Sequence, residues 1–286
     1  MDNGSDTAPQ DGCPYGDLYI YYLQGRVKDA EAIFGADFIG NWEEDGFSFL
    51  FFSRPCEKAV ADLVGADDGL TLIDAYTMPY DQWQGARLEP FEAGGLCITP
   101  PWTAAKAGPG QGRILLDPGV VFGAGTHTTT RDCLEALHLA CGDGAVESVL
   151  DLGTGTGVLA LAALRLGCRR AMAVDFNLLA ARTALGNARL NGLADRIGVV
   201  QGRAEEAIAW PADLVVANIH FDVMKDLVAA PGFLAKKRFV LSGLLRSQTR
   251  DIEEKLRSLP VTLHRRWDRD GVWHTVYGTV EGHVKG

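Results

Sequence analysis

Hydrophobic and polar positions are most clearly organised in the stretch 148–177, SVLDLGTGTGVLALAALRLGCRRAMAVDFN. An apolar run at 149–150 indicates a buried strand, and apolar residues then recur at helical spacing over 158–166. A second apolar run follows at 171–174. The pattern therefore predicts a strand, a glycine-rich turn, a helix and a second strand, which is the repeating unit of a parallel sheet.

The same rhythm continues toward the C-terminus. Further parallel strands are predicted at 197–202, 212–218 and 239–241. Helices are predicted at 178–190 and 248–259. The final section holds two strand-like runs joined through Asp270-Gly271, a dipeptide typical of a hairpin. We therefore expect five parallel strands closed by an antiparallel hairpin, a seven-stranded Rossmann-like α/β sheet.

The first third of the chain has a different pattern. Strands are predicted at 18–23, 46–53 and 71–76, and helices at 27–34 and 55–64. This alternation is typical of a small α+β domain, and it carries no cluster of titratable groups for chemistry, so we expect it to recognise the substrate. The predicted parts are a disordered N-terminus at 1–13, the small domain at 14–85, a linker and first strand at 86–112, and the Rossmann-like domain at 113–286.

Composition narrows the classes of function. The chain has 286 residues, a hydrophobic fraction of 47% and a formal net charge of −10. Proteins that grip nucleic acid do so with Lys and Arg, so the acidic balance argues against direct nucleic acid binding and is compatible with a basic protein partner. The six cysteines form no C-x-x-C pair, which disfavours zinc and disulfides. Neither a membrane-spanning run nor a signal peptide pattern is present, so we expect a cytoplasmic protein without membrane contact.

The glycine-rich turn carries the first candidate chemistry. Gly153, Gly155 and Gly157 follow a strand at two-residue spacing, where small residues let a ligand touch the main chain. Asp175 ends the next strand about twenty residues later, where an acidic side chain can accept the hydroxyls of an adenosine ribose. A tight turn without a ligand is the alternative, but Asp151 and Asp175 at strand ends favour a nucleoside-like cofactor.

The carboxylate before the turn favours a cationic cofactor. Nicotinamide dinucleotide folds read G-x-G-x-x-G and receive a pyrophosphate, which Asp151 would repel. The order Asp-x-Gly-x-Gly-x-Gly instead resembles the S-adenosylmethionine loop of class I methyltransferases. The resemblance implies that S-adenosyl-L-methionine is the cofactor.

A second glycine-rich stretch, VVFGAGTHTTT at 120–130, precedes a predicted helix at 131–141. Its threonines, among them Thr126 and Thr130, supply hydroxyls ahead of a helix N-terminus that favours a carboxylate. We expect this loop to close over the amino-acid end of the cofactor. N-capping explains any single threonine equally well, and a structural hydrogen bond explains His127 better than catalysis does.

Polar residues at the ends of later strands are candidates for the chemical step. The oxygen of the Asn218 amide can hold a substrate amine and aim its nitrogen lone pair at a methyl group. His220 and Phe221 follow in the sequence Asn-Ile-His-Phe; His220 fits a proton relay, and it fits a packing or hydrogen-bonding role as well. Glu205 either reaches an adenine base or begins a solvated helix.

These motifs together resemble the PrmA family, which methylates ribosomal protein L11 of the large subunit. The resemblance runs from about Trp83 to the C-terminus through EPFEAGGLCITPPW, DPGVVFGAGTHTTTRDCLEAL, VLDLGTGTGVLALAALRLG, VVANI and LSGLL. The block F-G-x-G-T-H-x-T-T is its most specific part, because other class I methyltransferases lack it. It implies a small recognition domain before a Rossmann-like domain, with cofactor contacts at Thr130, Gly153, Asp175 and Asn218.

The resemblance also implies the reaction, which is methylation of lysine side-chain or N-terminal amines of a basic protein, with ribosomal protein L11 as the first candidate. Two features depart from the family, which usually reads Asn-Ile-Leu-Ala where this chain has Asn-Ile-His-Phe, and which the chain matches poorly before Trp83. A diverged N-methyltransferase acting on another protein or a small amine is the first alternative. A non-catalytic S-adenosylmethionine-binding module is the second.

The predicted site has two groups of residues and no metal. The catalytic group is Asn218, His220 and Phe221. The cofactor-binding group is Thr126, Thr130, Asp151, Gly153, Gly155, Gly157, Asp175, Glu205 and Asn218.

Overall fold

The computed structural model describes residues 12–104, 112–269 and 271–282. The chain forms two compact units, one of Met1–Glu89 with Pro101–Ala107 and one of Pro90–Pro100 with Gly108–Gly286. Most of the N-terminal stretch predicted to be disordered, together with Asp270 of the predicted hairpin dipeptide, lies outside the described residues. The limits of the predicted domains stay a prediction.

The first unit contains a four-stranded antiparallel sheet with strand order β2-β3-β1-β4. Its elements are β1 (Asp17–Gln24), α1 (Ala30–Ile33), β2 (Phe38–Glu44), β3 (Phe47–Phe52), α2 (Glu57–Ala66), β4 (Thr71–Pro79), α3 (Tyr80–Trp83) and the short 3₁₀ helix η2 (Pro101–Thr103). Alternate residues of β1 and β3, among them Leu23 and Leu50, pack with Val60 of α2 in one hydrophobic core. The order βαββαβ is that of ferredoxin-like domains.

Strand β2 was not predicted from the sequence, which gave this unit three strands. Most of β2 is half-exposed at a sheet edge, so it shows no strong apolar alternation. Its turn into β3 is formed by Asp45 and Gly46, both with positive φ, of 50° and 85°. An Asp-Gly pair between two strand-like runs is the usual sequence signal of a two-residue hairpin, so Asp45-Gly46 could have indicated this turn.

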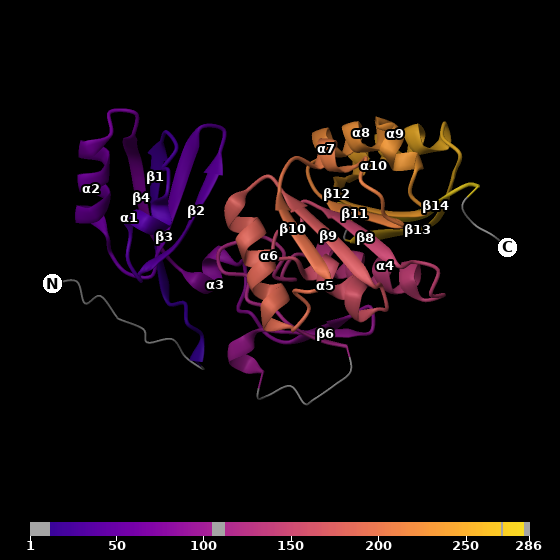
Figure 1. Cartoon of the computed structure of the whole chain (residues 1–286), viewed down its shortest axis with the longest axis horizontal. Coiled ribbons are helices and arrows are strands. Elements are labelled where there is room, and N and C mark those ends of the chain that lie inside the picture. The colour runs from indigo at the N-terminus through magenta and orange to yellow at the C-terminus, as the bar shows by residue number, and fades with distance from the viewer. Residues whose placement is uncertain (1–11, 105–111, 270, 283–286) are drawn as a thin grey trace. The chain divides into compact units, whose positions relative to one another are not determined.

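The second unit is built on a seven-stranded sheet of order β10-β9-β8-β11-β12-β14-β13, which confirms the predicted fold class (Figure 1). Its strands are β8 (Ser148–Leu152), β9 (Arg170–Asp175), β10 (Ile197–Gln201), β11 (Leu214–Asn218), β12 (Arg238–Leu245), β13 (Val261–Arg269) and β14 (Trp273–Val280). The first five run parallel, and the hairpin of β13 and β14 joins them antiparallel through β14.

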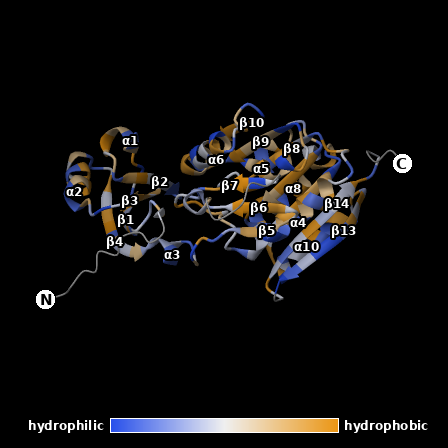
Figure 2. Ribbon diagram, turned by 90° about the horizontal axis from the view of Figure 1, so that it is seen from below, coloured by the Kyte–Doolittle hydropathy of each residue, from blue (hydrophilic) through white to orange (hydrophobic). Residues whose placement is uncertain are grey.

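Helices cover both faces of this sheet (Figure 1). One face carries α4 (Thr128–Cys141), α5 (Val158–Arg165) and α6 (Leu178–Leu190), and the other carries α7 (Ala204–Ala207), α8 (Phe221–Ala229), α9 (Pro231–Leu234) and α10 (Arg246–Arg257). Each face has its own hydrophobic core. The edge strand β13 is exposed along most of its length and is largely hydrophilic in Figure 2.

A three-stranded sheet lies before α4 in the same unit, formed by β5 (Phe91–Ala93), β6 (Leu96–Thr99) and β7 (Arg113–Leu115). Strands β6 and β7 pair in parallel, and β5 joins β6 antiparallel. No helix within the described residues combines the length and the apolar content that crossing a membrane requires.

Candidate active site

The candidate site lies at the carboxyl ends of the parallel strands. The strand order reverses between β8 and β11, and in such sheets ligands bind outside the strand ends at this switch point. Asp151 lies near the end of β8, Asp175 ends the neighbouring β9, and Asn218 ends β11. The fold therefore brings these three predicted residues to one edge of the sheet.

The glycine turn needs glycine at all three predicted positions. Gly153, Gly155 and Gly157 have φ of 74°, 54° and 82°, a region that favours glycine. Close approaches add to this requirement. A Cβ at Gly153 would lie 2.1 Å from Cγ2 of Ile219, and one at Gly155 would lie 2.5 Å from the carbonyl oxygen of Phe122. The turn thus presses its backbone against the end of β11 on one side and the 120–130 loop on the other.

Asp151 is fully buried and shapes the turn from within. One carboxylate oxygen, Oδ2, accepts hydrogen bonds from the Thr154 hydroxyl at 2.6 Å and the Ala160 N–H at 3.1 Å. The other oxygen, Oδ1, is buried without a hydrogen-bond partner among the described residues. Burial raises the pKa of this carboxyl to about 7, and the negative charge of Asp175 adds to the rise.

Asp175 connects the turn to the following helix. Its Oδ2 accepts the Gly155 N–H at 3.0 Å, and its Oδ1 accepts the Asn177 N–H at 3.0 Å. Burial raises the pKa of this carboxyl, and these two hydrogen bonds act against the rise. Each oxygen still has acceptor capacity for a ligand hydroxyl, because a carboxylate oxygen carries two lone pairs.

The two glycine-rich stretches of the sequence form one structure. Thr156 of the turn donates its N–H to the carbonyl oxygen of Phe122 at 3.2 Å and its hydroxyl to that of Gly123 at 3.0 Å. A Cβ at Gly123, where φ is 109°, would lie 2.8 Å from the Thr156 hydroxyl oxygen. The 120–130 loop therefore lies directly against the cofactor turn.

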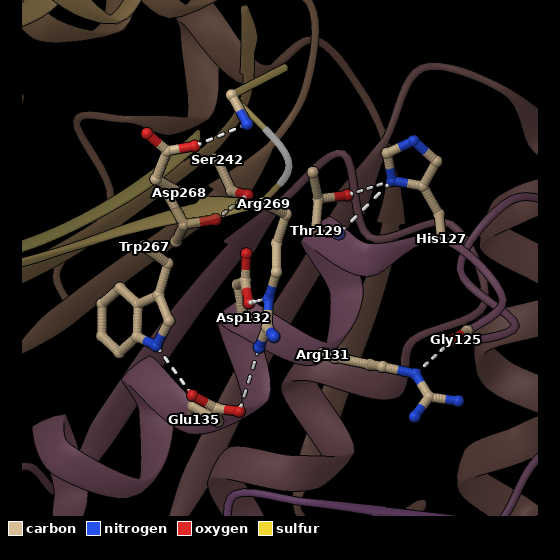
Figure 3. Close-up of polar contacts among 12 residues, drawn as sticks. Gly125, His127, Thr129, Arg131, Asp132, Glu135, Ser242, Trp267, Asp268 and Arg269 are labelled. Atoms are coloured by element: carbon tan, nitrogen blue, oxygen red, sulfur yellow. Dashed lines mark hydrogen bonds and ion pairs between the residues drawn. The ribbon is translucent and has the colours of Figure 1, made fainter. Parts of the chain in front are cut away.

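Helix α4 begins at Thr128, three residues before the predicted start, and its N-cap is His127 rather than a threonine. The N–H of Thr129 donates to Nδ1 of His127 at 3.3 Å (Figure 3). The hydroxyl of Thr130 is buried without a hydrogen-bond partner among the described residues, whereas Thr126 is exposed. Thr130 is thus the predicted threonine that has a buried group left to bind a ligand.

Asn218 is half-exposed and its amide is held from one side. Its Nδ2 donates to the Thr129 hydroxyl oxygen at 3.2 Å. His220 is exposed and immediately precedes α8. Phe221 begins that helix and packs against the core on this face of the sheet, with the Lys225 ammonium 4.8 Å from its ring centre.

Glu205 lies in the short helix α7, beyond the end of β10. Its Oε1 is 2.9 Å from Nη2 of Arg203 in an ion pair at the surface. This placement fits the solvated helix start, and the carboxylate retains capacity to accept a further hydrogen bond.

Sequence reasoning missed two groups of residues that support the site. Asn187 of α6, which is 2% exposed, donates to the carbonyl oxygens of Thr156 and Asp117 at 2.9 and 2.8 Å, and so ties the glycine turn to the 117–119 segment. Arg269 of β13 donates to Asp132 at 2.8 Å and to Glu135 at 3.3 Å, and so fixes the first turns of α4 (Figure 3). Only an asparagine repeated at helical spacing, at 187 and 191, hints at the first group in the sequence.

The residues present fit an S-adenosylmethionine cofactor. Buried polar atoms almost always have a hydrogen-bond partner, yet Asp151 Oδ1 and Thr130 Oγ1 have none among the described residues. Asp151 is a carboxylate, which suits a cationic ligand, and Asp175 can still accept hydroxyls. The described residues contain no group of three His, Cys, Asp or Glu side chains that could hold a metal ion.

Comparisons with known proteins identify a family whose members are similar to this chain. Residues 79–280 match the family described as ribosomal protein L11 methyltransferase (PrmA). A protein of that name from Pelotomaculum thermopropionicum is 39% identical over 207 residues, which cover 70% of this chain and 66% of that protein. One from Streptococcus equi subsp. zooepidemicus is 38% identical over 238 residues, covering 81% of this chain and 72% of the relative.

A solved structure supports the fold. The crystal structure of a ribosomal protein L11 methylase from Lactobacillus delbrueckii subsp. bulgaricus aligns with a TM-score of 0.58 at 28% identity, covering 67% of this chain and 98% of that one. The matched segments of the curated relatives range from 51% to 74% of their lengths. The predicted resemblance is confirmed, and the chain belongs to the PrmA family of S-adenosylmethionine-dependent ribosomal protein L11 methyltransferases.

Proposed function

We propose that this protein transfers methyl groups from S-adenosylmethionine to amine nitrogens of ribosomal protein L11. The observation that carries the proposal is the meeting of Asp151, the glycine turn, Asp175 and Asn218 at the switch point of the sheet. Membership of the family supports the choice of substrate, because the relatives described above are named for methylation of this protein.

The cofactor would be held along the strand ends. S-adenosylmethionine, when bound, supplies a methyl group activated by a sulfonium centre. Asp175 accepts hydrogen bonds from the ribose hydroxyls, and Gly153 and Gly155 let the backbone approach the ligand. Thr130, whose buried hydroxyl has no partner among the described residues, donates to the amino-acid end. Thr126 is exposed and Glu205 forms a surface ion pair, so we assign both to the rim of the site.

Asn218 is the residue that acts on the acceptor. A lysine amine has an ordinary pKa of roughly 10.4, so it must lose a proton before its lone pair can attack. The Asn218 carbonyl accepts a hydrogen bond from the neutral amine and directs its lone pair, which is alignment rather than covalent catalysis. His220, exposed beside it, receives the proton or passes it to solvent, while Phe221 holds the start of α8 against the core.

The first unit would recognise the substrate. Residues 14–85 contain thirteen Asp and Glu residues against four Lys and Arg, so this segment accounts for most of the net charge of −10. A surface of one sign attracts a partner of the opposite sign, and ribosomal proteins are basic because they bind RNA. Since its substrate is a ribosomal protein, we place the reaction in the cytoplasm.

The proposal is tested with methyl-labelled S-adenosylmethionine and a ribosomal protein extract from the source organism. We expect one labelled protein, identified by mass as L11, with the label on amine nitrogens that survives base treatment. Label on another protein would identify a diverged N-methyltransferase. Cofactor binding without label on any protein or small amine would identify a non-catalytic binding module, and either result would overturn the proposed substrate.

A further inference from the structure

The Asn218 amide belongs to a chain of hydrogen bonds that ends on a histidine. Its Nδ2 lies 3.2 Å from the hydroxyl oxygen of Thr129, and that oxygen lies 2.7 Å from Nδ1 of His127. The contact between Thr129 and His127 is drawn in Figure 3. Asn218 ends β11, and His127 and Thr129 lie at the start of α4. The hydrogen bond between Asn218 and Thr129 joins residues 89 positions apart in the sequence.

The direction of this chain follows from the tautomer of His127. The contact between the Thr129 N–H and Nδ1 of His127, at 3.3 Å, needs an unprotonated Nδ1, so we assign the ring that tautomer, with the single lone pair of Nδ1 shared between this N–H and the Thr129 hydroxyl. The hydrogen in the 2.7 Å contact must then come from the Thr129 hydroxyl. With its hydrogen used in this way, the hydroxyl oxygen is left only as an acceptor for Asn218. The amide must therefore present its NH₂ group to Thr129, which leaves its carbonyl oxygen facing away.

Burial keeps this arrangement in place. Thr129 is 1% exposed, so water cannot replace its hydroxyl if that group is removed. The imidazole ring of His127 packs against two aromatic rings, with centre distances of 5.6 Å to Phe122 and 4.9 Å to Trp273. The histidine is thus a fixed acceptor rather than a mobile side chain.

We propose that Thr129 is a positioning residue, whose hydroxyl sets the Asn218 amide with its oxygen toward the acceptor amine, and that His127 sets the direction of that hydroxyl. The inference rests on the proposed function, in which that oxygen holds the substrate nitrogen. An inverted amide would present N–H groups to the amine and repel its protons. The chain of hydrogen bonds from His127 through Thr129 to Asn218, here called the relay, therefore selects one of the two amide orientations. The two differ only by exchange of the oxygen and the NH₂ group, which are similar in size.

A matched pair of variants separates the hydroxyl from the rest of Thr129. Thr129→Val keeps the side-chain shape and the N–H that His127 caps, but it removes the relay. We expect kcat for methylation of L11 to fall roughly tenfold, on the scale of one lost hydrogen bond, with the S-adenosylmethionine dissociation constant unchanged within about twofold. Thr129→Ser restores the hydroxyl and should restore kcat to within about threefold. Equal kcat for wild type and Thr129→Val would overturn the proposal.

A second pair tests the histidine. His127→Asn places an amide oxygen close to the position of Nδ1, so it can cap α4 and accept the Thr129 hydroxyl. We expect this variant to retain most of the kcat, and His127→Leu to lose about as much as Thr129→Val does. Activity in His127→Leu equal to that of the asparagine variant would contradict the role of His127.

The relay can also be examined without a substrate. In ¹⁵N NMR spectra of the full-length protein, we expect His127 Nδ1 to show the shift of an unprotonated ring nitrogen, and the Asn218 amide signals to move in Thr129→Val but not in Thr129→Ser. A protonated Nδ1 in the wild type would overturn the proposal even if L11 proved not to be the substrate. Conversely, normal NMR signatures without L11 methylation would refute the proposed function and leave the relay standing.

Discussion

At the scale of single residues, Asp151 makes folding stability depend on pH. Burial raises the pKa of its carboxyl to about 7, so between about pH 4 and pH 7 the folded protein keeps a proton that the unfolded chain has lost. The unfolded state binds fewer protons in that window, and the free energy of unfolding therefore falls as pH rises. Below about pH 4 the Asp151 carboxyl is protonated in both the folded and the unfolded state, so no free energy of unfolding is lost through its ionisation.

Asp151→Asn removes this titration. We expect urea unfolding of the apo protein to show a decline on the order of 4 kcal/mol from this group between about pH 4 and pH 7 in the wild type, and a correspondingly flatter profile in the variant. Parallel profiles for the two proteins would show that the carboxyl is ionised in the folded state at pH 5.

Gly243 limits the space beside the Asn218 amide. Its φ is 82°, and a Cβ there would lie 3.0 Å from Asn218 Oδ1. We expect Gly243→Ala to lower kcat about tenfold or more by displacing the amide, with a loss of at least about 1 kcal/mol in unfolding free energy. Gly192→Ala is the matched control, because φ is also positive there, at 64°, but nothing lies within 4 Å. That control carries the backbone strain without the close contacts, so it should lose less stability and keep its activity; an inactive control would attribute the effect to backbone strain alone.

The sequence was enough to predict which residues at strand ends form the site, but not which side chains they would bind. Asp151, Asp175 and Asn218 each follow an apolar run, and the topology of a parallel sheet is enough to bring such ends together. The hydrogen bond from Asn218 to Thr129 joins residues 89 positions apart, and no periodicity in the sequence predicts it. N-capping by a threonine was one of two interpretations of the 120–130 loop, and the structure instead has His127 as the cap, because its ring nitrogen accepts the Thr129 N–H.

At the scale of elements, the hairpin of β13 and β14 holds the start of α4. Arg269 is 42% exposed, and it pairs with the fully buried carboxylate of Asp132. Burial raises the pKa of that carboxyl, while the hydrogen bond and charge of Arg269 oppose the rise. Removing the arginine therefore leaves a buried carboxyl without its cation.

We expect Arg269→Met to lower the free energy of unfolding by about 2 kcal/mol, less than for a fully buried pair because the arginine is partly solvated. Adding Asp132→Asn should recover more than half of that loss, since the buried charge is then gone. Purely additive losses in denaturant unfolding of the double variant would show that the two side chains do not depend on each other.

Elements with a buried face were predicted well, and elements at sheet edges less so. The inner parallel strands β8, β9, β11 and β12 appear as apolar runs because both of their faces are covered by helices. Strand β2 is half-exposed, so its sequence FIGNWEE shows little alternation, and only the Asp45-Gly46 turn marks it. The start of α4 was placed three residues late because threonines are weak helix formers.

At the scale of the whole molecule, the uneven distribution of charge predicts how the substrate is captured. In the proposed function the acidic residues 14–85 bind a basic substrate, and such an attraction acts over distances that salt screens. We expect the KM for L11 to rise roughly fivefold between about 0.05 M and 0.5 M NaCl, while the S-adenosylmethionine dissociation constant changes little. A KM for L11 that is independent of salt would indicate that recognition by the first unit is not electrostatic.

The most direct test of the central claim is the intact mass of purified L11 after incubation with S-adenosylmethionine and either the wild-type protein or Asn218→Ala. We expect the wild type to add methyl-sized mass steps to L11, and the variant to bind the cofactor and remain folded yet add methyl groups at least about a hundredfold more slowly. Unchanged turnover in Asn218→Ala would remove this residue from the mechanism. An unmodified L11 with the wild-type protein would contradict the proposed reaction itself.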